Sequence, residues 1–399
     1  MTTVPLKQPW LVLAGLALGV TVTHGFARMA YGLLLPAMKS ELGWTYSQAG
    51  WLNTANALGY LAGAVLTMLF IRRISPARLF AFGMAATTLS LLATGLHAGL
   101  GWQTFWRMAA GLLGALSFTT AGTLAAGLFP GDARRSALAI AILFGTGGGL
   151  GIVLTGGSLP LMLDAWGPAS WPAGWMGIGA ISVCSLPLSL WAASQLHAPV
   201  QTVQAKLTPL PVRRMLPVMA GYACFGLGYF VYPTFLSAWM TEQQAGAEFI
   251  ALVWVVLGIS LILSPFVWRR VMARHASGLP LALIMTCTAI GSALPVVLPK
   301  GPVLLVSAVV FGLAVFMVPG AVTNFVRQNL PAHAWGRAVS LMTLIFAVAQ
   351  IAGPYGAGLL ADHFDSIGVS LMAAAGVLLL GSALALLQRP LQQPAVRAG

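Results

Sequence analysis

Twelve long apolar runs divide the sequence, and they constrain its fold more than any other feature. They lie at about 10–38, 45–70, 77–98, 102–128, 133–160, 171–194, 213–240, 246–270, 278–298, 301–328, 334–361 and 368–388. Each run reaches the ~20 residues that an α-helix needs to cross ~30 Å of hydrocarbon. Helices are expected because lipid offers no partner to unpaired backbone groups, and the alternating pattern of barrel strands is absent. The sequence therefore predicts an all-α membrane protein with twelve transmembrane helices.

The charge composition agrees with this class and gives an orientation. Only 7% of the 399 residues are charged, against ~25% in soluble domains, which excludes a soluble globule or a disordered chain. The net charge of +13 follows from 20 basic and 7 acidic residues, and the basic residues gather between alternate runs. One side holds Arg134, Arg135, Arg213, Arg214, Arg269 and Arg270 among others, and the opposite side holds Lys39 and Lys300. The positive-inside rule then predicts cytoplasmic termini in a bacterial inner membrane, with lipid headgroups rather than nucleic acid as partners.

The second half of the chain repeats the first with an offset of 201 residues. The offset pairs Gly25 with Gly226, Tyr31 with Tyr232, Gly111 with Gly312, Pro130 with Pro331 and Asp164 with Asp365. Six runs in each half give both halves the same orientation, as in parallel transporter repeats. We expect a six-helix half at 1–194, a cytoplasmic linker at 195–212 and a second six-helix half at 213–399.

Several motifs in the first half resemble the major facilitator superfamily of transporters. Phe105-Trp-Arg107-Met-Ala-Ala-Gly111-Leu-Leu-Gly114 is similar to its fourth-span motif. Gly25-Phe-Ala-Arg28-Met-Ala-Tyr31-Gly-Leu-Leu-Leu-Pro36-Ala-Met38, Gln48-Ala-Gly50-Trp51 and Asn56-Ala-Leu-Gly59-Tyr60 resemble the YbfB/YjiJ-type branch. The resemblance implies the fold of that superfamily, with two pseudo-symmetric halves around a central cavity that the first span lines. The usual acid is missing from the loop after the second span, which departs from typical drug/proton antiporters of the superfamily.

Arg28 and His24 are ionisable residues near the middle of the first run, where a charge costs roughly 2.5–3.5 kcal/mol. They lie four residues apart and share a helix face. Arg28 offers a planar fork of donors that suits a carboxylate or sulfonate, and no carboxylate lies in the middle of any run. The alternative is a structural arginine bonded to backbone carbonyls or a tyrosine. His24 could carry a coupling proton, donate to the substrate, or simply pack.

Other polar and aromatic residues complete the predicted substrate site. The repeat places Tyr229 opposite Arg28 and Tyr232 opposite Tyr31, which predicts a cationic wall facing an aromatic wall. The candidate substrate-binding residues are Arg28, His24, Tyr31, Tyr229, Tyr232, Asn56, Trp254 and Gln350. For Arg107, the superfamily motif implies a role in coupling or gating, with anchoring at the headgroups as the alternative.

These residues predict a secondary transporter that works by alternating access on a small organic anion, with proton coupling through His24 as an option. Efflux of neutral or anionic amphipathic compounds is the first alternative. A non-transporting receptor is the second, although the tails and central loop leave little room for a signalling segment. Nucleophile, nucleotide and metal motifs are missing from the sequence, so we expect no enzyme, no cofactor and no metal. We expect a monomer.

Overall fold

The structure is a computed structural model that describes residues 8–71, 73–196 and 209–391. In this part of the chain, twelve helical stretches are long and apolar enough to cross a membrane, which confirms the twelve predicted spans. The first span consists of α1 (Pro9–Val20), η1 (Thr21–Met29) and α2 (Tyr31–Leu42). The second to sixth spans are α3 (Tyr46–Phe70), α4 (Pro76–Thr94), α5 (Leu100–Ala126), α6 (Ala133–Trp166) and α7 (Trp171–Ser194), and the short η2 (Pro168–Ser170) precedes α7. The other six are α8 (Val212–Gly228) with α9 (Val231–Glu242), α10 (Ala247–Arg274), α11 (Leu279–Val297), α12 (Gly301–Val315) with α13 (Val318–Asn329), α14 (Ala332–Phe364) and α15 (Ile367–Leu386).

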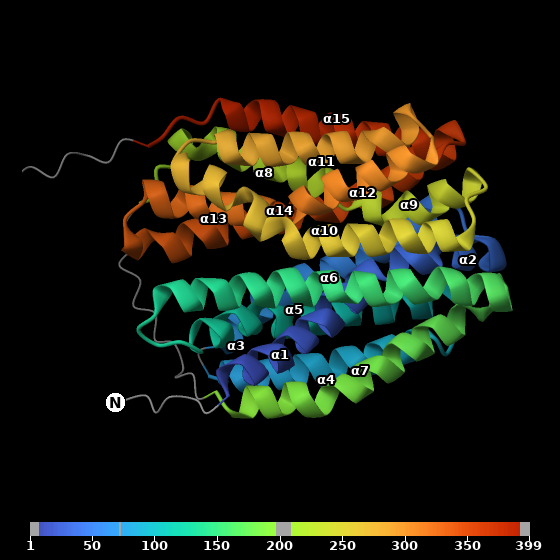
Figure 1. The fold of residues 1–399 in the computed structure, drawn as a ribbon, viewed down its shortest axis with the longest axis horizontal. Helices are drawn as coiled ribbons and strands as arrows, with labels where there is room; N and C mark the ends of the chain where they lie inside the picture. The colour runs from blue at the N-terminus through green and yellow to red at the C-terminus, as the bar shows by residue number, and fades with distance from the viewer. Residues whose placement is uncertain (1–7, 72, 197–208, 392–399) are drawn as a thin grey trace, which may run out of the picture.

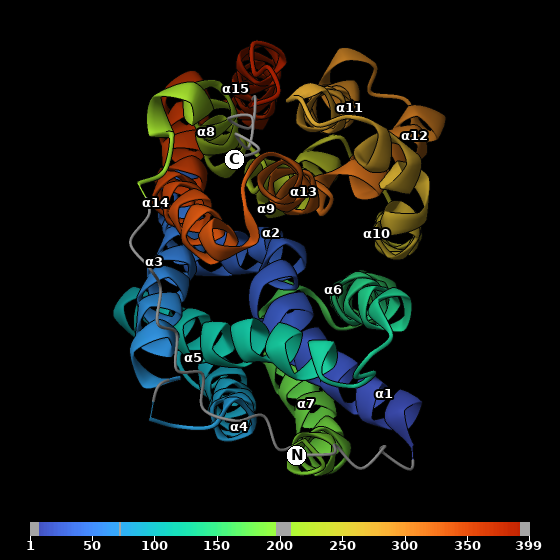
Figure 2. The ribbon, with the colours of Figure 1, turned by 90° about the vertical axis from the view of Figure 1, so that its left-hand side faces the viewer.

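The helices form two groups along one long bundle. Figure 1 shows the helices up to α7 in its lower part and those from α8 onward in its upper part. Seen along the bundle in Figure 2, α6 of the first group lies next to α10 of the second, and α3 lies next to α14. Residues 197–208 of the predicted linker lie outside the described residues.

Irregular helix segments occur at matching places in the two groups. The first span changes to a π-helix over Thr21–Met29, and the seventh is interrupted at Tyr229 and Phe230, between α8 and α9. The repeat offset of 201 residues places Arg28 at the first break and Tyr229 at the second. Because π-helical turns widen a helix and often occur at functional sites, these breaks mark the level of the bundle where a site is expected.

Glycine allows the two groups to touch through their backbones. A Cβ atom on Gly32 would lie 1.9 Å from the carbonyl oxygen of Pro233, and one on Gly50 would lie 2.2 Å from that of Pro354. Small residues permit this close approach between membrane helices. Both contacts join the first group to the second near the end that carries the α2–α3 and α14–α15 turns. We refer to this end as the predicted external end.

Candidate substrate site

Arg28 occupies the π-helical segment of the first span and reaches across to the second group of helices. Its side chain is buried, with 3% of its surface exposed. One terminal nitrogen, Nη2, donates to Oε1 of Gln350 at 2.9 Å and to the hydroxyl of Tyr229 at 3.3 Å. The Tyr229 hydroxyl donates in turn to the same Gln350 oxygen at 3.1 Å. One polar cluster therefore joins three residues that the sequence proposed as substrate contacts. They are Arg28 of the first span, Tyr229 at the α8–α9 break and Gln350 of α14.

Aromatic rings lie against the Arg28 guanidinium. Its central carbon is 4.6 Å from the ring centroid of Tyr60 and 5.0 Å from that of Phe230. Rings at this distance attract a cation through their quadrupole. The neutral partners and the rings solvate the charge in part, but no acidic side chain among the described residues forms an ion pair with Arg28.

Buried donors in this cluster remain without an acceptor. Nε of Arg28 and Nε2 of Gln350 are both buried, and neither has a hydrogen-bond partner among the residues that the structure describes. A buried donor without a partner costs ~1–3 kcal/mol, and more when the group is charged. The pattern is one of surplus donors around a single positive charge, which suits a ligand that brings acceptor oxygens and a negative charge.

His24 lies one turn from Arg28 between two phenyl rings. The centroid distance is 4.8 Å to Phe118, which is stacked, and 5.2 Å to Phe316, which meets it edge-on. Phe118 belongs to α5, and Phe316 lies at the α12–α13 break in the other group. The His24 atom Nδ1 is buried without a hydrogen-bond partner among the described residues, so one polar atom faces this aromatic surrounding.

Arg107 is also buried, but it serves a different network. Its Nη1 donates to the carbonyl oxygen of Ala27 at 2.6 Å, and its Nη2 to Oδ1 of Asn53 at 3.0 Å. The amide of Asn53 then donates to the Thr234 hydroxyl on α9 at 2.8 Å. Asn56 donates to the backbone oxygen of Arg107 at 3.0 Å, while its own Oδ1 has no partner within the described part of the chain. Arg107 thus holds the backbone directly before Arg28 and connects it to the second group.

The remaining predicted contacts form their hydrogen bonds within their own groups of helices. Tyr31 donates to the backbone oxygen of Ala49 at 2.8 Å. The Tyr232 hydroxyl is 2.7 Å from that of Ser307, and Trp254 donates to the Ser237 hydroxyl at 2.9 Å. These three large side chains are fully buried, and the structure does not bring them into the Arg28 cluster.

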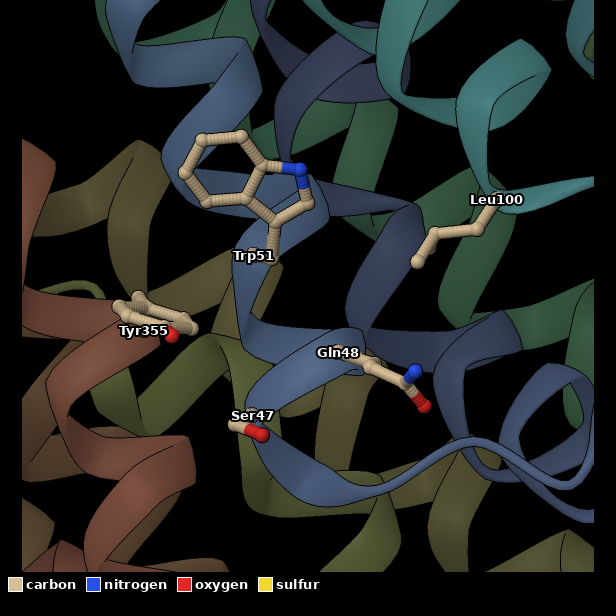
Figure 3. Close-up of a pocket in the computed structure, with 5 residues that line it drawn as sticks. All are labelled: Ser47, Gln48, Trp51, Leu100 and Tyr355. Carbon is tan, nitrogen blue, oxygen red and sulfur yellow. The ribbon is translucent and has the colours of Figure 1, made fainter.

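A cavity of about 300 Å³ lies elsewhere, beside the contact between α3 and α14. Figure 3 shows Ser47, Gln48 and Trp51 of α3, Leu100 of α5 and Tyr355 of α14 around it. The rings of Trp51 and Tyr355 meet edge-on with centroids 5.9 Å apart. Its lining shares no residue with the Arg28 cluster, so this cavity marks the junction of the two groups near the predicted external end.

The sequence interpretation missed the rings around the charge. Tyr60, Phe118, Phe230 and Phe316 were not among the candidates, although Tyr60 ends the Asn56–Tyr60 motif and lies one turn after Asn56. That spacing was the available indication that Tyr60 shares a face with a candidate residue. Phenylalanines are common in every apolar run, so only the fold distinguishes these from lipid-facing or core rings.

The twelve spans, the two groups of helices and the buried polar cluster between them define a transporter of the major facilitator type. The sequence over residues 20–386 matches the family described as "Uncharacterised MFS-type transporter YbfB". The chain belongs to this family, which confirms the resemblance noted in its motifs. A search of curated protein sequences finds no significant match.

Solved structures of transporters share the fold at low sequence identity. The D-xylose–proton symporter aligns with a TM-score of 0.76 and 14% identity over 96% of this chain and 98% of its own. The nucleoside transporter NupG, in a mutant form, gives a TM-score of 0.72 and 13% identity over 94% and 98%. A bacterial homologue of the human lysosomal transporter Spinster gives 0.74 and 14% over 96% and 97%. At these identities the similarity concerns the fold.

Proposed function

We propose that this protein is a secondary transporter for a small organic anion that binds at Arg28. The observation that supports the proposal is a buried guanidinium whose Nε lacks an acceptor and whose described partners are all neutral. A carboxylate would supply the missing acceptor and compensate the charge. Gln350, whose Nε2 is also unpartnered, would donate a further hydrogen bond to the same anion.

The mechanism uses the position of Arg28 between the two groups of helices. Arg28 donates to Tyr229 and Gln350 of the second group. A bound anion would compete with Tyr229 and Gln350 for the N–H groups of Arg28. Binding of the anion and the contact between the two groups of helices would therefore be coupled at Arg28. Differential contacts of this kind allow a ligand to change the balance between conformations, which is what alternating access requires.

The test is exchange of anions by purified protein in proteoliposomes, with a panel of monocarboxylates, sulfonates and dicarboxylates. We expect Arg28→Gln to lower transport of the best substrate about a hundredfold, because two charge-assisted hydrogen bonds are lost. Arg327→Gln is the matched control, since Arg327 is exposed and stacks on Trp335. If Arg28→Gln transports the substrate as well as the parent does, the proposal is wrong.

We propose His24 as the residue through which transport would couple to protons. A charge on His24 would lie one turn from Arg28 and between two phenyl rings. An anion in the site would offset the repulsion between the two cations, so protonation would accompany substrate binding. The expected result is that His24→Gln flattens the pH profile of anion transport between about pH 5 and 8. An unchanged profile excludes this role.

We propose a gating role for Arg107 and an inner-membrane location with cytoplasmic termini. Arg107 supports gating because its network joins α5, α3 and α9 across the two groups. The orientation is supported by the exposed arginines Arg134, Arg135, Arg213 and Arg214 at the end opposite the predicted external end.

Efflux of anionic amphipathic compounds is a second candidate function, and the rings around Arg28 and His24 favour it. It uses the same site but the opposite direction of net transport. Susceptibility of a deletion strain to anionic amphiphiles, compared with its growth on organic acids as nutrients, separates export from uptake.

A further inference from the structure

The charge around Arg28 limits how many negative charges a ligand can carry. The other buried arginine, Arg107, uses both terminal nitrogens on Ala27 and Asn53. Its guanidinium also packs against Tyr31 and Trp175, at 5.0 and 5.5 Å. Nε of Arg107 has no partner among the described residues either, but both of its terminal nitrogens are taken, and the charge that lies against the rings of Tyr60 and Phe230 is that of Arg28. With His24 neutral, a second negative charge would enter a poorly solvated site without compensation.

The hydrogen-bonding geometry of Arg28 suits an anionic group that presents two oxygens in the plane of the guanidinium. All N–H bonds of a guanidinium lie in its plane, and the rings of Tyr60 and Phe230 pack against this cation. A ligand must therefore reach the N–H groups in the guanidinium plane. The two coplanar oxygens of a carboxylate match this arrangement, as in bidentate arginine–carboxylate pairs.

The surface next to Arg28 is aromatic and partly accessible. Phe118 and Phe316 enclose His24 from opposite groups of helices. Phe118 also meets Tyr60 at 6.2 Å and Phe144 at 4.8 Å. Phe118, Phe144 and Phe316 are only partly buried, whereas Arg28 is buried. These rings would contact the part of a ligand that extends from its charged group, and rings pair well with another flat ring.

We infer that the Arg28 site takes aromatic monocarboxylates: one carboxylate on Arg28 and a flat apolar body against Phe118 and Phe316. The inference rests on the proposed anion-transport function and narrows its substrate class. His24, with its unpartnered Nδ1, provides one polar contact beside the rings. Beside this contact the surface consists of the rings of Phe118, Phe144 and Phe316, so a body with many hydroxyl groups, or with a second anionic group, would lose hydration there.

Calorimetric titration of the purified protein tests this class directly. The probes are benzoate, acetate, phthalate, inorganic phosphate and benzyl alcohol, each at pH 7. We expect benzoate to bind at least about tenfold more tightly than acetate, because the ring adds buried apolar surface. Phthalate, phosphate and benzyl alcohol should bind more weakly than benzoate. Arg28→Gln should remove benzoate binding.

Matched ring substitutions separate the aromatic surface from general packing. Phe118→Leu should weaken benzoate binding about threefold to tenfold and leave acetate binding unchanged. Phe311→Leu is the control, because Phe311 stacks on Tyr232 at 4.1 Å within the second group, and it should change neither affinity.

The outcomes distinguish this inference from the proposed function. If acetate, phthalate or phosphate binds as tightly as benzoate and Arg28→Gln abolishes that binding, the class of aromatic monocarboxylates is wrong and anion binding at Arg28 stands. If benzyl alcohol binds as tightly as benzoate, or if no anion in the panel binds, both the substrate class and the anion function are wrong.

Discussion

Neutral groups hold the Arg28 guanidinium in the middle of the bundle, and they offset part of the cost of burying its charge. Placing an arginine at the centre of a membrane helix costs roughly 2.5–3.5 kcal/mol. Two hydrogen-bonding partners, Tyr229 and Gln350, and two rings, Tyr60 and Phe230, offset part of this cost. Each of these partners is also a group that the proposed anion would meet, so stability and the proposed binding would involve the same atoms.

Tyr229→Phe tests the hydroxyl that links Arg28 to Gln350. The change keeps the ring and its packing on Phe225, at 4.7 Å, but removes one acceptor and one donor. We expect anion affinity to fall about tenfold, since the hydroxyl that donates to Gln350 would donate to the bound anion instead, and a hydrogen bond to a charged group contributes ~1.5–3 kcal/mol. Titration of the purified variant with benzoate measures the change.

Tyr222→Phe is the matched control for this hydroxyl. Tyr222 is buried and stacks on Phe346 at 5.2 Å, and it takes no part in the Arg28 cluster. Its substitution should leave affinity within about twofold of the parent. Equal losses in both variants would show that ring packing, and not the Tyr229 hydroxyl, sets the affinity.

The sequence could predict the span count and the pairing of Arg28 with Tyr229, but not the rings around them. The pairing of Arg28 with Tyr229 follows from the repeat because both residues occupy the same place in two similar halves. Tyr232 and Trp254 have the same kind of sequence support, yet they bond to Ser307 and Ser237 within their own group. Rotation of a helix about its axis decides between these outcomes, and a uniformly apolar sequence gives little information on it.

At the scale of single helices, α3 depends on a residue of the other group for its N-terminus. Thr45 accepts from the backbone N–H of Gln48, and that glutamine side chain accepts from the backbone of Thr45. The N–H groups of Tyr46 and Ser47 donate instead to Asp362 of α14, at 2.7 and 2.9 Å. The Tyr46 hydroxyl also donates to Glu242 of α9. A helix N-terminus favours a carboxylate, so Asp362 stabilises the contact between the groups at the predicted external end.

Asp362→Asn should weaken this contact, because it removes the negative charge and one of the two acceptor oxygens. A capping interaction contributes ~1 kcal/mol, which corresponds to an about fivefold shift in population toward conformers with this end parted. The reporter is Thr54→Cys on α3 in a variant that lacks Cys184, Cys224 and Cys287. Thr54 is buried and bonds to Ile351 at 2.7 Å, so its labelling rate by an impermeant maleimide should rise.

Asp365→Asn controls for the loss of charge at the same end. Asp365 ends α14 in a left-handed conformation, with φ of 48°, which asparagine also adopts readily. Labelling of the Thr54→Cys reporter should stay at the parent rate. A similar rise in both aspartate variants would assign the effect to the electrostatic field of this end and not to the helix cap.

Across the whole molecule, one series of contacts between the two groups runs from Arg28 to the predicted external end, and His24 and Phe316 meet on the other side of Arg28. Arg28 joins Gln350, Asn53 joins Thr234, and Thr54 joins the backbone of Ile351. Further toward that end, the backbones touch at Gly32, Gly50 and Gly358. Alternating access requires these contacts to separate as a unit, because packed helices move largely as rigid bodies.

Gly50→Val should hold the two groups apart at the predicted external end. Its Cβ would lie 2.2 Å from the carbonyl oxygen of Pro354, and backbone atoms on both sides leave the side chain nowhere to move. We expect anion exchange to fall at least about tenfold and labelling of the Thr54→Cys reporter to increase. Gly356→Val is the control, because that glycine on α14 has open space around its Cβ and the same residue is introduced. If Gly50→Val transports normally with the reporter still protected, the closed contact between α3 and α14 does not belong to the transport cycle.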